Sequence, residues 1–367
     1  MKILYDHQIF TEQIYGGISR YFIELANHIA LNNPEKVTVK IISPFYKNNY
    51  LSADNTNFLF RGFRFPDFPK SGRLCSIMNS FFFPILSKHY NPNIIHQTYY
   101  NILKYKKMRA KKIITIHDMI HEIFPDEFLK KDNTSKLKKI AVAEADHIIC
   151  VSKNTQNDLI KLLNVDIKKT TVIYNGFSLR VKEAKKPEKV RRPYLLYVGN
   201  RKGYKNFNRF VKAYNTSKIK NYFDVVLFGG GKINNDEIEI FDKLEIPKDS
   251  FKQVDGDDSS LAGFYKNASL LVYPSLYEGF GIPPLEAMSY GCPVVCSNVS
   301  SIPEVVGDAA LLFDPYSVDS IKDNIISVLY DHKIRLSLIS KGLKQVKNFS
   351  WEKCAKETYN VYQKAMK

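Results

Sequence analysis

Short, almost continuous apolar runs recur along the first half of the chain and alternate with longer segments of helical periodicity. The runs are rich in β-branched residues, which is typical of strands buried on both faces of a sheet. They lie at Lys2–Tyr5, Val37–Ser43, Ile94–Gln97, Ile113–His117, His147–Val151 and Thr171–Tyr174. Amphipathic segments such as Ile18–Ala30 and Thr155–Leu163 separate them, and Ser152 is placed to cap the latter. This alternation predicts a parallel, doubly wound α/β sheet.

The alternation stops at residues 181–192, which hold eight charges and one Pro without an apolar period. It then restarts with one clear helical segment, Phe207–Tyr214, and a second set of strand-like runs. These runs are Tyr194–Val198, Val225–Phe228, Phe251–Val254, Leu270–Tyr273, Pro293–Cys296 and Leu311–Phe313. We therefore expect two α/β domains, 1–178 and 193–350, joined by a linker at 179–192. The last segment, 351–367, reads as a helix capped by Ser350, and its spacing does not decide which domain it joins.

Composition narrows the class of protein. The 367 residues include 54 Lys plus Arg and 37 Asp plus Glu, a formal net charge of +17, and the 24 Phe and 23 Tyr exclude intrinsic disorder. The five cysteines are too scattered for a disulfide framework or a zinc site, which indicates a reducing compartment. The N-terminus lacks the apolar run of a secretory signal, and the longest apolar stretch, Ile77–Leu86, is interrupted and too short to span a bilayer. We expect a cytoplasmic protein whose positive charge serves an anionic partner or solvation.

Ligands of open parallel sheets bind at the carboxyl ends of the strands, so the residues that follow each strand are the candidates. In the first domain, Gly16 and Gly17 lead into a helix whose backbone N–H groups could bind an anion, although a plain tight turn explains them equally well. His117 and Asp118 follow a strand, where a histidine could bind a substrate or act as acid or base, or could be structural. We interpret His96 as structural.

In the second domain, Arg201 and Lys205 lie between a strand and a helix. A guanidinium and an ammonium at a helix start could bind a diphosphate. The alternative is a solvated basic loop without a ligand. Gly229 and Gly230 follow the next strand and would allow close backbone approach to a ligand, or simply form a turn.

The most informative segment is Tyr273 to Met288, in which two acids lie eight positions apart. Gly279, Gly281 and the prolines at 283 and 284 rule out one continuous helix. We expect a strand, a loop that carries Glu278, and a helix from near residue 283 with Glu286 in its first turn. The backbone N–H groups of Phe280, Gly281 and Ile282 would then face the same space as Glu278. Two ordinary surface acids are the alternative.

The segment Tyr-Pro-Ser-x-x-Glu278-Gly-Phe-Gly-Ile-Pro-Pro-Leu-Glu286-Ala-Met resembles the signature of retaining family 4 glycosyltransferases of GT-B fold. Further collinear matches carry the resemblance from residue 16 to about 315. They are Gly16-Gly17, His117-Asp118, Tyr197-Val-Gly-Asn-Arg-Lys-x-x-Lys-Asn, Gly291-Cys-Pro-Val-Val-Cys-Ser-Asn and Ile302-Pro-Glu-Val-Val-Gly-Asp-Ala-Ala. The opening Tyr5-Asp6-His7-Gln8-Ile9-Phe10, with Tyr15-Gly-Gly-Ile-Ser-Arg-Tyr-Phe, is similar to a less specific mannosyltransferase-like branch that builds bacterial surface polysaccharides.

This resemblance implies two Rossmann-like domains that face an interdomain cleft, with the C-terminal helix crossing back to the first domain. It implies that a nucleoside-diphosphate sugar, with mannose favoured, donates to a glycan or a polyprenyl-diphosphate-linked glycan. No metal or other cofactor would be needed; the one Asp-x-Asp triplet, Asp255 to Asp257, lies in a loop without further metal ligands. Retention could use a covalent intermediate or front-side attack, of which we favour the second.

The resemblance also implies a role for each matching residue. Arg201 and Lys205 would neutralise the leaving diphosphate, Glu286 would bind the ribose hydroxyls and Glu278 the hydroxyls of the donor sugar. His117 would contact the donor sugar near the reacting carbon. Gly17, Gly229 and Gly230 would approach phosphate or nucleotide through their backbone.

Two other classes of protein remain as alternatives: a related GT-B enzyme such as a nucleotide-sugar epimerase, and a nucleic-acid-binding protein suggested by the net charge. The latter lacks any recognised nucleic-acid-binding motif, so we expect no nucleic-acid partner.

A peripheral membrane contact is a further expectation from two segments of the first domain. Six cations lie within residues 104–112 (Lys104, Lys106, Lys107, Arg109, Lys111 and Lys112), and Phe81, Phe82 and Phe83 form an aromatic cluster. Near an anionic bilayer each cation contributes about 1 kcal/mol, and exposed Phe can enter the interface. A solvated basic loop and a buried aromatic cluster are the alternative.

Overall fold

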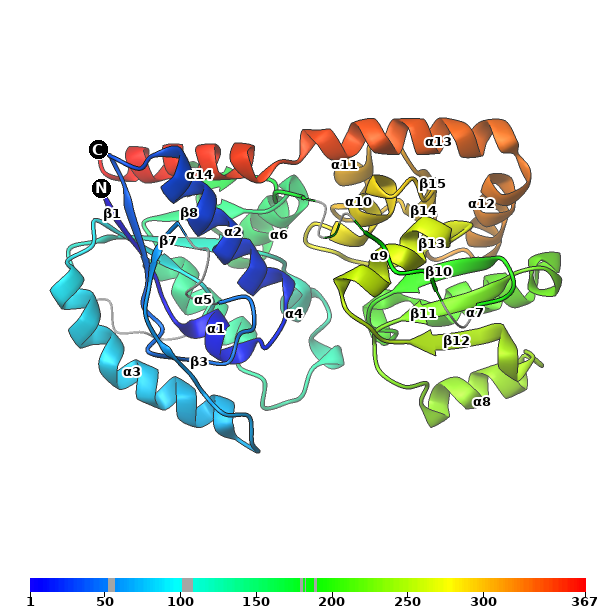
Figure 1. The fold of residues 1–367 in the computed structure, drawn as a ribbon, viewed down its shortest axis with the longest axis horizontal. Helices are drawn as coiled ribbons and strands as arrows, with labels where there is room; N and C mark the ends of the chain where they lie inside the picture. The colour runs from blue at the N-terminus through cyan, green and yellow to red at the C-terminus, as the bar shows by residue number, and fades with distance from the viewer. Residues whose placement is uncertain (52–56, 101–107, 179–180, 182, 188–189) are drawn as a thin grey trace. The chain divides into compact units, whose positions relative to one another are not determined.

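A computed structural model describes residues 1–51, 57–100, 108–178, 181, 183–187 and 190–367 (Figure 1). The chain divides into two compact units. Unit 1 comprises Met1–Gly176 together with Ser350–Lys367, and unit 2 comprises Phe177–Phe349. Each unit has a parallel sheet with helices on both faces.

Unit 1 has a central sheet in the order β4-β2-β1-β6-β7-β8-β9 among its described residues. Its strands are β1 (Lys2–Tyr5), β2 (Thr38–Ile41), β4 (Leu59–Phe60), β6 (Ile94–Gln97), β7 (Lys111–Ile116), β8 (His147–Cys150) and β9 (Thr170–Val172), and β3 (Phe45–Tyr46) pairs with β5 (Phe63–Arg64) beside it. Its helices are α1 (Gln8–Glu12), α2 (Gly17–Asn32), α3 (Ser71–Tyr90), α4 (Ile120–Ile123), α5 (Thr134–Glu144), α6 (Lys153–Leu163) and α14 (Trp351–Ala365).

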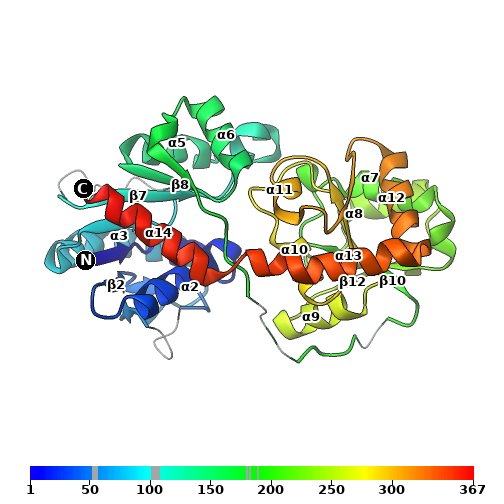
Figure 2. The same cartoon turned by 90° about the horizontal axis from the view of Figure 1, so that it is seen from above.

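The strands of unit 1 are apolar on both faces because helices cover both. Ile3 and Tyr5 belong to the core beneath α2 and α14, whereas the intervening Leu4 packs with Phe83 of α3 in a second cluster. Alternate residues of one strand thus enter different cores. α14 lies alongside α2 (Figure 2), and Ser350 caps it by accepting a hydrogen bond from the Lys353 backbone N–H at 3.1 Å.

Unit 2 has the strand order β12-β11-β10-β13-β14-β15. The strands are β10 (Tyr194–Val198), β11 (Asp224–Phe228), β12 (Phe251–Val254), β13 (Leu270–Tyr273), β14 (Val294–Ser297) and β15 (Leu311–Phe313). The helices are α7 (Phe207–Asn215), α8 (Asn235–Lys243), α9 (Asp258–Asn267), α10 (Ile282–Ser289), α11 (Ile302–Val306), α12 (Val318–Tyr330) and α13 (His332–Gln345). The chain reverses its direction of travel across the sheet between β10 and β13, which is the switch point where ligands of such sheets bind.

The described part of the charged segment 181–192 packs on unit 2. The Lys185 backbone N–H donates to the Ser259 carbonyl at 3.1 Å, and the Lys185 Nζ lies 2.8 Å from the Asp257 carboxylate. Asp257 also caps α9 by accepting from the Ser260 N–H. The triplet Asp255 to Asp257 therefore contributes to local structure, and the described residues include no group of three or more His, Cys, Asp or Glu side chains that could hold a metal ion.

Candidate active site

Three loops that carry predicted site residues follow neighbouring strands of unit 2. β11, β10 and β13 are adjacent and parallel, so the loops after them leave the same edge of the sheet. The loops are joined directly: the Leu276 N–H donates to the Tyr204 carbonyl at 2.7 Å, and the Asn206 side chain donates to the Pro274 carbonyl at 3.0 Å. The β10 and β13 loops thus meet at the switch point.

An ion pair between Lys205 and Glu278 lies at this junction. The Lys205 Nζ is 2.6 Å from the Glu278 Oε1, and both side chains are largely but not fully buried. The ammonium also lies 5.9 Å from the centroid of the Tyr273 ring. Partial burial strengthens these attractions relative to water. The two residues that the motifs assign to the diphosphate and to the donor sugar thus lie next to each other in the structure.

The backbone around Glu278 is fixed by two serines. The Glu278 N–H donates to the Ser300 Oγ at 2.9 Å, while the Ser301 Oγ donates to the Glu278 carbonyl at 2.8 Å. Ser301 also donates to the Phe280 carbonyl at 3.1 Å. These bonds tie the backbone of the Glu278 loop to the residues that follow β14.

Arg201 takes a different direction from Lys205, although both come from the same loop. Its Nε is 2.7 Å from the Glu237 Oε1, and both side chains are buried. Its Nη1 donates to the Gly229 carbonyl at 3.0 Å and its Nη2 to the Gly231 carbonyl, also at 3.0 Å. Every nitrogen of the guanidinium therefore donates to a protein acceptor. Arg201 links the β10 loop to the glycine loop and to α8.

The glycine loop depends on its lack of side chains. Gly229, Gly230 and Gly231 all have φ between +74° and +79°, a region that other residues rarely adopt. A Cβ at Gly230 would lie 2.5 Å from the Gly199 carbonyl oxygen and 2.9 Å from the Arg201 Nη1. Close approach of backbone to backbone, rather than a plain turn, accounts for glycine at this position.

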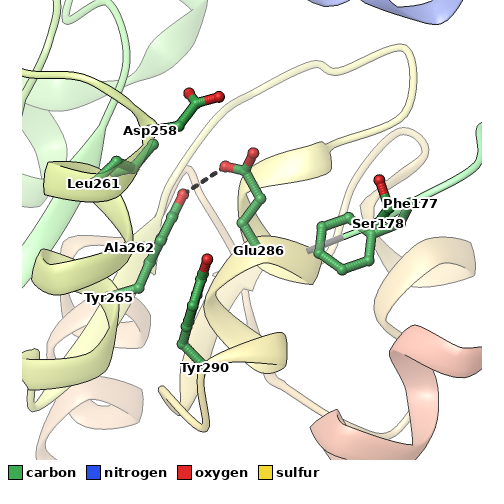
Figure 3. Close-up of a pocket in the computed structure, with 8 residues that line it drawn as sticks. All are labelled: Phe177, Ser178, Asp258, Leu261, Ala262, Tyr265, Glu286 and Tyr290. Atoms are coloured by element: carbon green, nitrogen blue, oxygen red, sulfur yellow. Dashed lines mark hydrogen bonds between the residues drawn. The ribbon is translucent and has the colours of Figure 1, made fainter. Parts of the chain in front are cut away.

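Glu286 lies in α10 and lines a small pocket with Tyr265 and Tyr290 (Figure 3). The Tyr265 hydroxyl donates to the Glu286 Oε2 at 2.9 Å, and the two tyrosine rings are parallel within 9° with centroids 6.1 Å apart. The expected place of Glu286 in the first turn is wrong. Because α10 begins at Ile282, Glu286 is its fifth residue, one turn away from the helix start.

The N-terminus of α10 itself has backbone groups to offer. Its N-cap is Gly281, with φ +94°, and no side chain caps the helix. The ring of Phe280 is buried and packs edge-on against Phe349 at 5.6 Å. The segment Phe280 to Ile282 is therefore anchored by a side chain while its amides start a helix.

In unit 1, His117 follows β7 as predicted. Its ring packs edge-on against Tyr21 at 5.0 Å, and its Nε2 is shut off from solvent without a hydrogen-bond partner among the described residues. Burial, reinforced by the nearby Lys138 ammonium, lowers the pKa of His117 to about 3. His117 is thus a neutral imidazole at physiological pH.

Lys138 is a buried cation that the sequence did not reveal. Its Nζ donates to the Asp118 carbonyl at 2.9 Å and to the Glu122 carboxylate at 2.7 Å, so it fixes the turn after His117. A single lysine in a segment without a motif carries no signal of this kind. His96, by contrast, is the satisfied core histidine that we expected, with Nδ1 2.6 Å from the Tyr362 hydroxyl and Nε2 2.9 Å from the Thr115 hydroxyl.

Gly16 and Gly17 start α2. Gly16 is the N-cap in an extended conformation, and a Cβ on Gly17 would meet no atom within 4 Å. The Gln13 Oε1 accepts from the Ser19 N–H at 3.1 Å and so already occupies part of this helix start. Gly17 itself is exposed, with open space where a side chain would be.

Comparison with known proteins identifies the family of this chain. Residues 15–181 match the family described as Glycosyltransferase Family 4, and residues 179–345 match Glycosyl transferases group 1. O-antigen chain mannosyltransferase B of Escherichia coli is 33% identical over 267 residues, which cover 69% of this chain and 70% of that protein.

Solved structures share the fold. Sucrose-phosphate synthase from Thermosynechococcus elongatus aligns over 99% of this chain and 98% of its own, with a TM-score of 0.78 and 19% identity. Anabaena HepE in complex with UDP-glucose aligns over 99% of this chain and 100% of its own, with a TM-score of 0.74 and 16% identity. These likenesses confirm the expected fold class, two Rossmann-like α/β domains of GT-B type.

Proposed function

Because the chain belongs to the glycosyltransferase family described by Glycosyltransferase Family 4 and Glycosyl transferases group 1, we propose that it transfers a hexosyl group from a nucleoside-diphosphate sugar. Mannose is favoured as the sugar, and a glycan or polyprenyl-diphosphate-linked glycan of surface polysaccharide synthesis as the acceptor. The name of the similar Escherichia coli protein, an O-antigen chain mannosyltransferase, supports both choices.

The observation that carries the proposal is the pair of Lys205 and Glu278 at the switch point of the unit 2 sheet. The Lys205 ammonium would lie against the diphosphate, and Glu278 would hold hydroxyls of the donor sugar next to it. A cation held in place before the reaction stabilises the charge that grows on the leaving phosphate. The ion pair in turn keeps both side chains oriented in the absence of donor.

The nucleoside would occupy the side of the site near Glu286. Its carboxylate suits the paired ribose hydroxyls, and Tyr265 and Tyr290 provide aromatic surface in the same pocket. The Tyr265 hydroxyl, which donates to Glu286, would keep the carboxylate oriented.

Arg201 has two candidate roles. The motif predicts direct contact with the diphosphate, whereas the observed bonds support a positioning role. Arg201 would hold the glycine loop in place through the carbonyls of Gly229 and Gly231. A phosphate could then come close to the backbone of Gly229 and Gly230. We propose the positioning role, and the amides at Phe280 to Ile282 as additional donors to the ligand.

The reaction would proceed with retention and without metal. The bond from the anomeric carbon to the diphosphate oxygen breaks with both electrons leaving on that oxygen. The acceptor oxygen bonds to the same face of the carbon, and its proton passes to the departing phosphate. Neutral His117 would contact the donor sugar, and the backbone at Gly16 and Gly17 would approach the phosphate.

Hydrogen exchange with GDP, UDP and ADP, each tested alone and as a mannose or glucose conjugate, tests the site. A bound nucleotide at a concentration of 100 times its dissociation constant should raise the free energy of unfolding by about 2.7 kcal/mol. We expect slower exchange at residues 199–206, 229–232 and 275–290 with one nucleotide and unchanged exchange in β12, which lies at the sheet edge. Stabilisation without protection of these loops would contradict the proposed site.

We place the protein in the cytoplasm, with a peripheral contact to an anionic membrane surface through the basic stretch of residues 104–112. Arg109 and Lys111 are exposed, and the Lys111 Nζ lies 4.0 Å from the Asp146 carboxylate. Lys112 is half-buried. Lys104, Lys106 and Lys107 lie outside the described residues.

A further inference from the structure

Helix α3 exposes its apolar side chains to solvent and buries mainly small or polar ones, which is the reverse of an ordinary amphipathic helix. Its inward positions are mostly small or polar: Ser71, Cys75, Asn79, Phe83, Ser87 and Tyr90 are buried. Its large apolar side chains point outward instead, and Phe81 is 69% exposed. The others are Leu74, Ile77, Phe82, Ile85 and Leu86, each at least 39% exposed. We call these six residues the α3 apolar face. Isolated exposed apolar residues are ordinary, but a continuous set along one helix indicates an interaction surface.

Specific polar bonds hold the helix in this orientation. The Asn79 Oδ1 accepts from the Phe45 N–H at 2.9 Å, and its Nδ2 donates to the Phe45 carbonyl at 2.6 Å, so this side chain pairs with β3 as a strand would. The Tyr90 hydroxyl donates to the Thr38 carbonyl at 3.0 Å. Rotating the α3 apolar face inward would break these bonds and leave partly buried backbone groups of Phe45 without their partner.

The charge of α3 indicates what covers its apolar face. Residues 71–90 contain Arg73 and Lys88 but no Asp or Glu. Both cations are exposed, as is Lys70 just before the helix. The nearby Asp67 is neutralised by Lys47 at 2.6 Å. A second copy of the same face would bring like charges together, whereas an anionic lipid surface accepts both the cations and the apolar side chains.

We infer that α3 lies in the plane of an anionic membrane surface with its apolar face in the lipid interface. Its 20 residues extend about 30 Å at 1.5 Å per residue. None of the helices in the described parts of the chain is long and apolar enough to cross a bilayer, so α3 would rest on the surface. Of the three expected phenylalanines, Phe81 and Phe82 face outward, while Phe83 belongs to the core. This inference does not depend on the donor site.

Co-sedimentation with vesicles tests it on the full chain. We compare wild type with the variant Phe81→Ser/Ile85→Ser. The vesicles consist either of phosphatidylcholine alone, which has no net charge, or of phosphatidylcholine with about 30 mol% phosphatidylglycerol, which makes the surface anionic. The matched control is Leu336→Ser/Leu343→Ser, two exposed leucines of α13 in unit 2. Because all four side chains are exposed, thermal melting should show that every variant folds.

We expect wild type and the α13 variant to bind the anionic vesicles alike and the α3 variant to bind at least tenfold more weakly. Arg73→Glu/Lys88→Glu should weaken binding to anionic vesicles only. A Phe81→Trp probe should shift its emission to the blue on binding, while Trp351 is buried and should not. Equal binding of the α3 variant, or a wild-type dimer that the α3 changes dissociate without altering vesicle binding, would overturn the inference. The first result would leave the basic stretch as the membrane contact, and the second would assign α3 to self-association.

Discussion

Replacing Arg201 by Met should destabilise unit 2 strongly, because the guanidinium is buried and donates to four residues, Glu237, Gly229, Gly231 and Lys232. The change leaves the buried Glu237 carboxylate without its cation and the carbonyls of Gly229 and Gly231 without their donor. Breaking a buried ion pair in this way costs about 3–5 kcal/mol. Arg201→Lys should cost less but not zero, since an ammonium cannot reproduce the planar set of donors. In the double variant with Glu237→Met no buried charge remains unpaired, so the two losses should not add.

The buried cysteines allow the two units to be followed separately. Cys292 and Cys296 report on unit 2, and Cys75, Cys150 and Cys354 report on unit 1. Pulsed thiol labelling across a urea series, read by peptide mass spectrometry, gives an unfolding free energy for each unit. Arg201→Met should lower that of unit 2 alone.

The competing role of Arg201, direct contact with the leaving diphosphate, makes a different prediction. It requires Arg201→Met to keep the stability of unit 2 within about 1 kcal/mol of wild type. Turnover at saturating donor would then fall by roughly two orders of magnitude, about 3 kcal/mol of transition-state stabilisation. That combination would refute the positioning role.

Three further changes have distinct expected outcomes. Lys205→Met should lower kcat at least tenfold with a smaller change in donor KM, because the leaving charge grows only during the reaction; an unchanged kcat would exclude Lys205 from the diphosphate. Tyr265→Phe and Glu286→Gln should each raise the donor KM several-fold and weaken nucleotide binding in titration calorimetry, with kcat nearly constant; a pure kcat effect would argue against nucleoside binding there. Burial lowers the pKa of His117 to about 3, whereas the unfolded chain binds that proton below about pH 6.5. The contribution of this residue to stability should therefore be complete above about pH 6.5 and should be lost at about 1.4 kcal/mol for each unit by which the pH is lowered below that value. In His117→Asn the free energy of unfolding of unit 1 should fall less steeply with acidification by that amount, and identical slopes would contradict the neutral imidazole.

The strands were the most predictable elements because their burial on both faces gives an unambiguous apolar run. Lys2–Tyr5 and Leu270–Tyr273 are strands with the predicted bounds, and Ser152 caps α6 as expected. α3 was not predicted as a helix, since its inward positions are small or polar and its apolar residues face out. The usual relation between hydrophobic period and core is reversed there.

For the site, the motifs identified which loops carry chemistry but not how their side chains are partnered. The short separation from β13 brings Glu278 to the sheet edge, and local sequence suffices to predict that. The partner of Arg201, by contrast, is 36 residues away on α8. Sequence spacing contains no information on such a pair. The position of Glu286 was misjudged for a different reason: α10 begins at Ile282, and that start depends on the left-handed conformation of Gly281.

Whether the chain breaks a nucleoside-diphosphate sugar with retention can be measured without knowing the acceptor. Proton NMR of GDP-mannose, UDP-glucose and ADP-glucose, each incubated with the enzyme in excess chelator, follows slow transfer of the sugar to water. One donor should release its nucleoside diphosphate, and the free sugar should first appear as the α anomer before it equilibrates. Glu278→Gln should slow that release. Primary release of the β anomer would contradict retention, and loss of release on chelation would contradict metal independence. Three unchanged donors would contradict the proposed activity toward these sugars.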